Sequence, residues 1–185
     1  WAPANGGPAW QGWLPHADLA VAQAMTVGSA PHETLWQSMK GPGELRLKFR
    51  VDLRKMLQPA IQPGARLDFE YPPESVTIRF VSSSRIQLSS AAESRVDGNS
   101  AEIRIDNSKT EMVNVELRTR FEDGDPRLSI QFSTSDDPTP RALPLRRFFV
   151  PWSVSGDESR SGPASTPEIP EIAGGSWVRG RKVFY

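Results

Sequence analysis

Strict alternation of apolar and polar residues is the feature that most limits how this chain can fold. Residues 45–53 alternate without a break between apolar and charged side chains. This is the pattern of a β-strand with one buried face and one wet face. The apolar members of this run are Leu45, Leu47, Phe49, Val51 and Leu53. Shorter runs of the same kind occupy 67–71, 76–80, 86–88, 103–105, 113–117, 128–132 and 143–145.

Turn-forming residues separate these runs. Examples are Pro63-Gly64, Asp97-Gly98-Asn99 and Asp136-Asp137-Pro138, which suit a reversal of the chain. Short strands that recur about every 10 residues predict a mostly β fold, an antiparallel β-sandwich of about eight strands. Residues 56–63 are predicted to form a packed turn instead, since their two prolines cannot donate to a β-ladder.

The region before the first strand predicts a short helical cap. Residues 16–25 are good helix formers ended by Gly28, and a second helix is expected over 29–39, with Ser29 as its N-cap and Pro31 in its first turn. We therefore expect an irregular and helical cap at 1–43, a β-sandwich at 44–153, a Pro/Ser/Gly linker at 154–175 and the start of another helix at 176–185.

Composition excludes several functions. Lys and Arg together number 22, as do Asp and Glu, so net charge gives no reason to expect nucleic acid as a partner. The chain has no cysteine, which removes thiol catalysis, disulfides and covalent haem attachment within it. No stretch approaches the roughly 18 apolar residues of a membrane helix, so membrane insertion is not expected.

The residues that could carry chemistry are few. His16 and His32 are the only histidines, and a metal site would need Asp18 or Glu33 as a further ligand. Alternatively, the two imidazole rings form hydrogen bonds with nearby groups, which accounts for their presence equally well. The carboxylate pairs Glu70/Glu74, Asp123/Asp125 and Asp136/Asp137 lie in or beside turns, where acidic residues are expected. We therefore predict no catalytic residue, no metal and no cofactor in this chain.

Tryptophan is the enriched residue, with 6 in the chain. Trp10, Trp13 and Trp152 are the candidates for a face that stacks on a sugar ring or contacts a partner. The alternative is that they pack helices and loops against the sheets, which is the commoner use of tryptophan. Exposure of the rings would favour binding, and burial would favour packing.

Two groups of residues resemble known families. Gly180, Lys182 and Phe184 resemble the start of the first helix in c-type cytochrome domains, where a glycine, a basic residue and an aromatic residue come shortly before the Cys-x-x-Cys-His haem motif. In that family these positions serve helix packing. The segments 12–16, 32–36, 42–43 and 57–64 are similar to a region of large planctomycete-type haem-binding proteins, in which such a module precedes a cytochrome c domain.

The resemblance implies an exported, periplasmic or cell-surface protein cut just before a haem c domain, with neighbouring domains of the same polypeptide as partners. We accordingly expect a non-catalytic accessory module that positions a haem domain against an upstream, sugar-dehydrogenase-like redox domain in an electron-transferring parent protein, or that holds a substrate or partner nearby. The alternative is a carbohydrate-binding β-sandwich that uses exposed tryptophans on a polysaccharide. A sugar-active enzyme is a third hypothesis and would need two carboxylates converging in a pocket.

Overall fold

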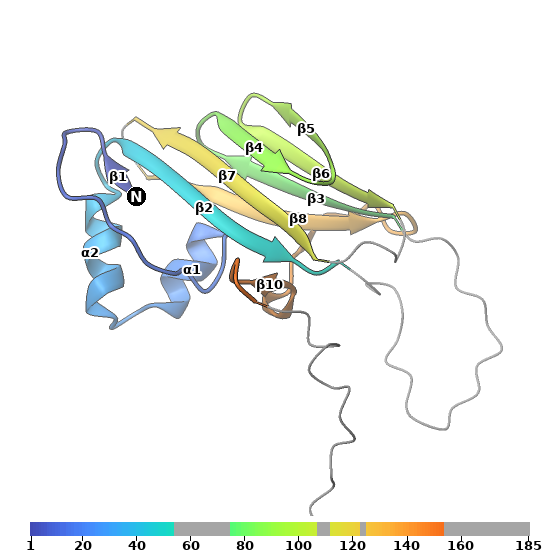
Figure 1. The fold of residues 1–185 in the computed structure, drawn as a ribbon, viewed down its shortest axis with the longest axis horizontal. Helices are drawn as coiled ribbons and strands as arrows, with labels where there is room; N and C mark the ends of the chain where they lie inside the picture. Colours follow the sequence, from blue (N-terminus) through green and yellow to red (C-terminus); the bar gives the residue numbers. More distant parts are fainter. Residues whose placement is uncertain (54–74, 107–111, 123–124, 154–185) are drawn as a thin grey trace, which may run out of the picture. The chain divides into compact units, whose positions relative to one another are not determined.

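Two antiparallel sheets make up the body of the molecule (Figure 1). The structure is a computed structural model and describes residues 1–53, 75–106, 112–122 and 125–153. Sheet A has the order β1 (Ala2–Pro3), β2 (Gly43–Val51), β7 (Val113–Phe121), β4 (Ile86–Ser90), and β10 (Phe148–Phe149) also pairs with β2. Sheet B has the order β5 (Glu93–Asp97), β6 (Ser100–Asp106), β3 (Ser75–Ser82), β8 (Leu128–Thr134), β9 (Arg141–Ala142). The predicted β-sandwich is confirmed.

The core lies between the sheets and is built from every second residue of the long strands. In sheet A, Leu47 pairs with Leu117 and Phe49 with Val115; in sheet B, Ile78 pairs with Ile103 on one side and Phe132 on the other. The predicted alternation thus directs the apolar side chains to one layer. Its largest fully buried members are Phe80, Leu35, Met39, Ile78, Ile86, Ile103, Leu117, Ile130 and Val51.

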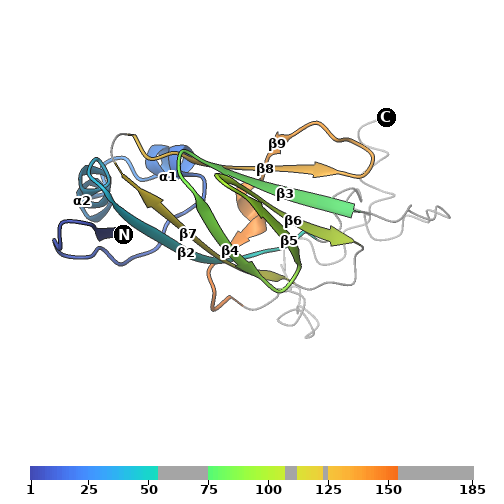
Figure 2. The same ribbon diagram turned by 90° about the horizontal axis from the view of Figure 1, so that it is seen from above.

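The two open sides of the sandwich are closed in different ways (Figure 2). On one side, only two residues separate β4 of sheet A from β5 of sheet B, so the chain steps directly between the sheets. On the other side lie α1 (Leu19–Met25) and α2 (Ala30–Ser38), with α1 next to β8. Leu19, Leu35 and Met39 belong to the same core as the strands, so the cap and the sandwich bury their apolar surfaces together.

Hydrogen bonds from His16 and to Asp18 attach the helical cap to the sandwich. The backbone N–H of Asp18 donates to His16 Nδ1 at 2.9 Å, so the proton is on Nε2, which donates to the carbonyl of Leu143 at 3.2 Å. The Asp18 carboxylate accepts from Ala20 and Val21 in α1 and, through Oδ2, from Ile130 in β8. The helix therefore begins at Leu19, not at His16 as predicted, because Asp18 is its N-cap.

The second helix begins where the sequence predicted, but its cap works differently. Ser29 has N-cap geometry, and Pro31 lies in the first turn. The Ser29 hydroxyl contacts His32 Nδ1 at 2.7 Å and makes no capping bond to the backbone. Ser29 therefore positions an imidazole ring, and the helix end depends on tertiary packing.

Gly43 is required at the start of β2 by a close approach of the chain. The Trp1 ring packs directly over this residue, and a Cβ there would lie 2.7 Å from the carbonyl oxygen of Ala2. Only glycine leaves room for β1 to pair with β2.

Some expectations from the sequence were wrong or incomplete. Residues 143–145 are not a strand: β9 ends at Ala142, and a 3-10 helix (Leu145–Arg147) follows Pro144, which has no N–H to donate to a ladder. The strands β1, β5, β9 and β10 were not predicted, since β5 is exposed at every position and the other three contain two residues each. The predicted strand at 67–71, the turn at 56–63, the linker at 154–175 and the helix start at 176–185 lie outside the described residues.

The described helices are short. Neither reaches the length and apolarity of a membrane-spanning helix.

Phe80→Ala tests the core directly. The Phe80 ring is fully buried and lies 6.3 Å, centroid to centroid, from the Phe49 ring of the opposite sheet. We expect the substitution to lower the free energy of unfolding by about 3–5 kcal/mol, because it removes buried surface and leaves a cavity. Urea denaturation measures this, with the exposed Val96 of β5 changed to alanine as control, for which a loss below about 1 kcal/mol is expected. Equal losses for the two variants would contradict this core.

Candidate functional site

The three tryptophans proposed as a ligand face differ in their surroundings. Trp152 is 76% exposed and Trp13 is 59% exposed. Trp10 is half-buried, and its indole Nε1 donates to the carbonyl of Pro31 at 2.9 Å. The structure thus leaves two of the three rings accessible to a ligand and holds the third against α2.

Trp10 and Trp13 are brought together by His32. Their ring centroids lie 5.7 and 5.9 Å from that of His32, with interplanar angles of 52° and 83°. The two indole planes are therefore not parallel, and they do not form a flat platform. Within the described part of the chain, no aromatic contact joins Trp152 to either of them.

The two histidines are buried, and both nitrogens of each ring are engaged. His32 contacts the Ser29 hydroxyl through Nδ1 and the carbonyl of Trp13 through Nε2, at 3.0 Å. Those bonds are short-range, whereas His16 reaches Leu143, 127 residues away. A metal ion at either ring would have to displace these bonds, and the described residues contain no group of three metal-ligating side chains.

Two of the carboxylates predicted at turns, Asp137 and Asp125, have structural partners. Asp137 accepts from the Thr139 N–H at 3.0 Å and pairs with Arg141 at 3.4 Å. The bond from Thr139 holds the pKa of Asp137 below its usual value, with a smaller contribution from Arg141. Asp125 pairs with Arg127 at 3.3 Å, while Asp123, Glu70 and Glu74 lie outside the described residues.

The outer face of sheet A carries a concentration of positive charge that the sequence analysis did not identify. Its outward positions hold five cations and two carboxylates, namely Arg46, Lys48, Arg50, Arg118, Arg120, Glu44 and Glu116. The outer face of sheet B holds three arginines and four carboxylates, namely Arg79, Arg95, Arg104, Glu93, Asp97, Glu102 and Asp106. The zero net charge of the chain therefore conceals an uneven distribution between the two faces.

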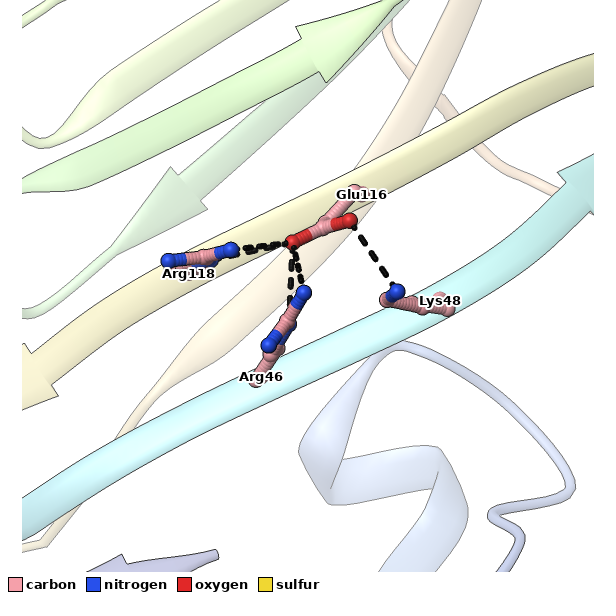
Figure 3. A network of polar contacts seen from close by, with 4 residues as sticks. All are labelled: Arg46, Lys48, Glu116 and Arg118. Carbon is pink, nitrogen blue, oxygen red and sulfur yellow. Dashed lines mark hydrogen bonds and ion pairs between the residues drawn. The ribbon is translucent and has the colours of Figure 1, made fainter.

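Glu116 organises the centre of this basic face (Figure 3). Its Oε1 accepts from Arg118 Nη2 at 2.7 Å and from Arg46 Nη2 at 2.8 Å, while Oε2 lies 3.4 Å from Lys48 Nζ. The hydrogen bonds from Arg118, followed by those from Lys48 and the charges of Arg46 and Lys48, lower the pKa of Glu116 to about 2. One carboxylate thus holds three cationic side chains at fixed positions.

A polar cavity of about 610 Å³ lies at one end of this face. Arg85, Gln87, Arg118 and Arg120 line it together with Glu44 and Glu122. Asp125 also borders it, but the Asp125 side chain is 81% exposed, which is unlike the low-dielectric pocket of a glycosidase acid. A second cavity, of about 660 Å³, lies beside α1, α2 and the start of β8 and includes Trp36 and Met39.

The signal for the basic face was present in the sequence as charged residues at the polar positions of two alternating runs. Such positions are typical of a solvated face. Only the pairing of β2, β7 and β4 shows that charges 70 residues apart, such as Arg46 and Glu116, are neighbours.

Comparison of the chain with protein-family models, with curated proteins and with solved structures finds no match.

Replacing Glu116 by glutamine tests the network through its pH dependence. The pKa of Glu116 is about 2 in the folded protein, against an ordinary value of 4.5. Its ionised form therefore stabilises the fold fully above pH 4.5, and this contribution disappears as the pH falls towards 2. We expect urea midpoints of the wild type and Glu116→Gln to differ most above pH 5 and to converge towards pH 2. Ser89→Ala, at the neighbouring position of β4, removes no titratable group and should keep a constant offset; an equally constant offset for Glu116→Gln would refute the network.

Proposed function

We propose that the chain is a non-catalytic accessory module that holds neighbouring domains of one polypeptide at a set separation. The observation that carries this proposal is that β1 and β10 are fastened to opposite ends of the same strand. Ala2 pairs with Glu44 near the start of β2, and Phe148 pairs with Val51 at its end (Figure 1). A strand rises about 3.3 Å per residue, so the two attachment points lie about 23 Å apart.

Both attachments are reinforced by side chains. The Trp1 ring is buried at 7% exposure and packs against Phe121 at 6.3 Å between centroids. At the other end, the Phe148 ring packs on Phe49 and His16, and the carbonyl of Ser153 accepts from Arg50. Both attachments are thus held firmly against the sandwich, and the length of β2 sets the distance between them.

The parent that we propose is an exported multidomain protein with a haem c domain after this module, and it is supported by the resemblance of Gly180, Lys182 and Phe184 to a cytochrome helix start. Those residues lie outside the described part of the chain. The physical benefit of the module is a high effective concentration of one redox domain next to the other. Its partners are then the neighbouring domains, and haem belongs to the parent, not to the module.

Deletion of residues 1–153 from such a parent tests the positioning role. We expect the rate of electron transfer between the flanking domains to fall while the haem absorption spectrum stays unchanged, because the module controls their separation and not the haem site. Stopped-flow reduction of the haem measures the rate. A flexible Gly/Ser segment that replaces the module should give a rate as low as the deletion; an unchanged rate in either variant contradicts the proposal.

Carbohydrate binding through the tryptophans is the second candidate, and it is favoured by the exposure of Trp13 and Trp152. An exposed indole offers a flat apolar surface on which a sugar ring can stack. Trp10 contributes less, because its Nε1 is engaged by Pro31.

Trp13→Ala and Trp152→Ala test this candidate by affinity electrophoresis in gels that contain polysaccharides. We expect each substitution to weaken retention about tenfold, since a stacking contact contributes about 1 kcal/mol beyond its buried area. Val27→Ala removes another exposed apolar side chain, which is 84% exposed, and should leave retention unchanged. Wild-type protein that no neutral glycan retards would eliminate the candidate.

A further inference from the structure

Three arginines meet at one corner of sheet A, where they line the 610 Å³ cavity. Arg118 and Arg120 occupy successive outward positions of β7, opposite Gln87 and Glu44. Arg85 directly precedes β4, whose first residue pairs with Thr119, the residue before Arg120. The arginines thus come from two neighbouring strands and face one space.

The three arginines differ in how their charge is compensated. Arg118 donates to Glu116 through both Nε and Nη2, at 3.0 and 2.7 Å. Arg85 and Arg120 are exposed, and neither has an ion-pair or hydrogen-bond partner within 1–53, 75–106, 112–122 and 125–153. The guanidinium donors of Arg85 and Arg120 are therefore available to a bound anion.

The same cavity also presents hydrogen-bond acceptors and neutral polar groups. Glu44, Glu122 and Asp125 contribute carboxylates, and Ser83, Ser84 and Gln87 contribute hydroxyl and amide groups. Guanidinium groups are suited to bind a carboxylate in a bidentate manner, and carboxylates accept hydrogen bonds from hydroxyl groups. The lining is therefore complementary to a molecule that carries both an acidic group and several hydroxyl groups.

We propose that this cavity is a binding site for an acidic oligosaccharide, a sugar chain with carboxylate groups. Arg85 and Arg120 bind a sugar carboxylate, while Glu44, Glu122 and Gln87 take hydroxyl groups of the same or the adjacent ring. Glu116 forms ion pairs with Arg118 and Arg46 beside the cavity. Arg46, Arg118 and Gln87 lie side by side on β2, β7 and β4, so this row of polar side chains extends the binding surface beyond the cavity.

The lining favours an acidic sugar over a nucleic acid. Three carboxylates at the cavity repel the closely spaced phosphates of a nucleic acid backbone. Exposed aromatic residues on which bases stack are not among those that line the cavity. Carboxylates that are spread along a sugar chain with hydroxyl groups between them satisfy both kinds of lining residue.

This inference goes beyond the carbohydrate-binding candidate, because the arginine site shares no residue with the tryptophans. It is also independent of the positioning role, which concerns the attachment of β1 and β10 to β2. If the positioning role or the tryptophan-mediated binding is disproved, the arginine site can still be tested by itself.

The experiment is isothermal titration calorimetry of the full chain with short chains of galacturonate, of alginate uronates and of hyaluronate, at low salt. We expect at least one of these to bind, and Arg85→Gln and Arg120→Gln to weaken its affinity about tenfold each, since each removes a charge-assisted hydrogen bond. Arg79→Gln is the matched control, because Arg79 is an exposed arginine that is paired with Glu102 on the outer face of sheet B. The Arg79→Gln variant should bind the uronate chain with the affinity of the wild type. Trp13→Ala and Trp152→Ala should also leave this affinity unchanged.

Two further ligands decide what is recognised. A methyl-esterified galacturonate chain keeps the hydroxyl groups but loses the negative charge, and we expect it to bind about tenfold more weakly or not at all. Equal affinity for the ester would overturn the carboxylate assignment. Absence of binding by all three uronate chains, or tighter binding of a single-stranded DNA oligonucleotide that depends on the same two arginines, would overturn the proposal as a whole.

Discussion

One apolar layer, shared by two sheets, determines almost everything else in this molecule. The strands β2, β7, β3, β6 and β8 each turn alternate side chains into it, and residues such as Phe80, Ile103 and Leu117 lose all contact with water. Burial at this scale is the main favourable term in folding. Because the layer is filled by apolar side chains, the polar residues of the same strands point outward. Any ligand must therefore bind on an outer face, at the cap or at a loop.

The parts of the fold that could be predicted from sequence are those with a local signal. Alternation located β2, β3, β6, β7 and β8, because each has one wet and one buried face. It failed for β5, whose residues are exposed on both faces, and for Leu143, which is buried at 3% exposure in a segment bounded by prolines and not in a strand. The start of α1 was misplaced although its signal is local: Asp18 is a preferred N-cap residue, and its Oδ1 accepts from the N–H groups of Ala20 and Val21.

The candidate site could not be predicted from local sequence patterns, because it depends on strand pairing. Charges at the polar positions of a strand are ordinary, and Arg46, Arg118 and Arg85 lie far apart in the sequence. Antiparallel pairing turns them into neighbours on a surface, and the balanced composition of the whole chain gives no hint of it. The three candidate tryptophans, by contrast, were conspicuous in the sequence, yet only Trp13 and Trp152 among them are exposed, and the indole rings of Trp10 and Trp13 are not parallel.

The bond between His16 and Leu143 has a consequence for how the protein is made. During synthesis the cap leaves the ribosome well before β8 and the carbonyl of Leu143, to which it is hydrogen-bonded. Until then α1 lacks β8, the strand that it packs beside, and apolar surface left uncovered in this way is prone to misassociation. The N-terminal cap can therefore complete its packing only after the chain has been made as far as Leu143.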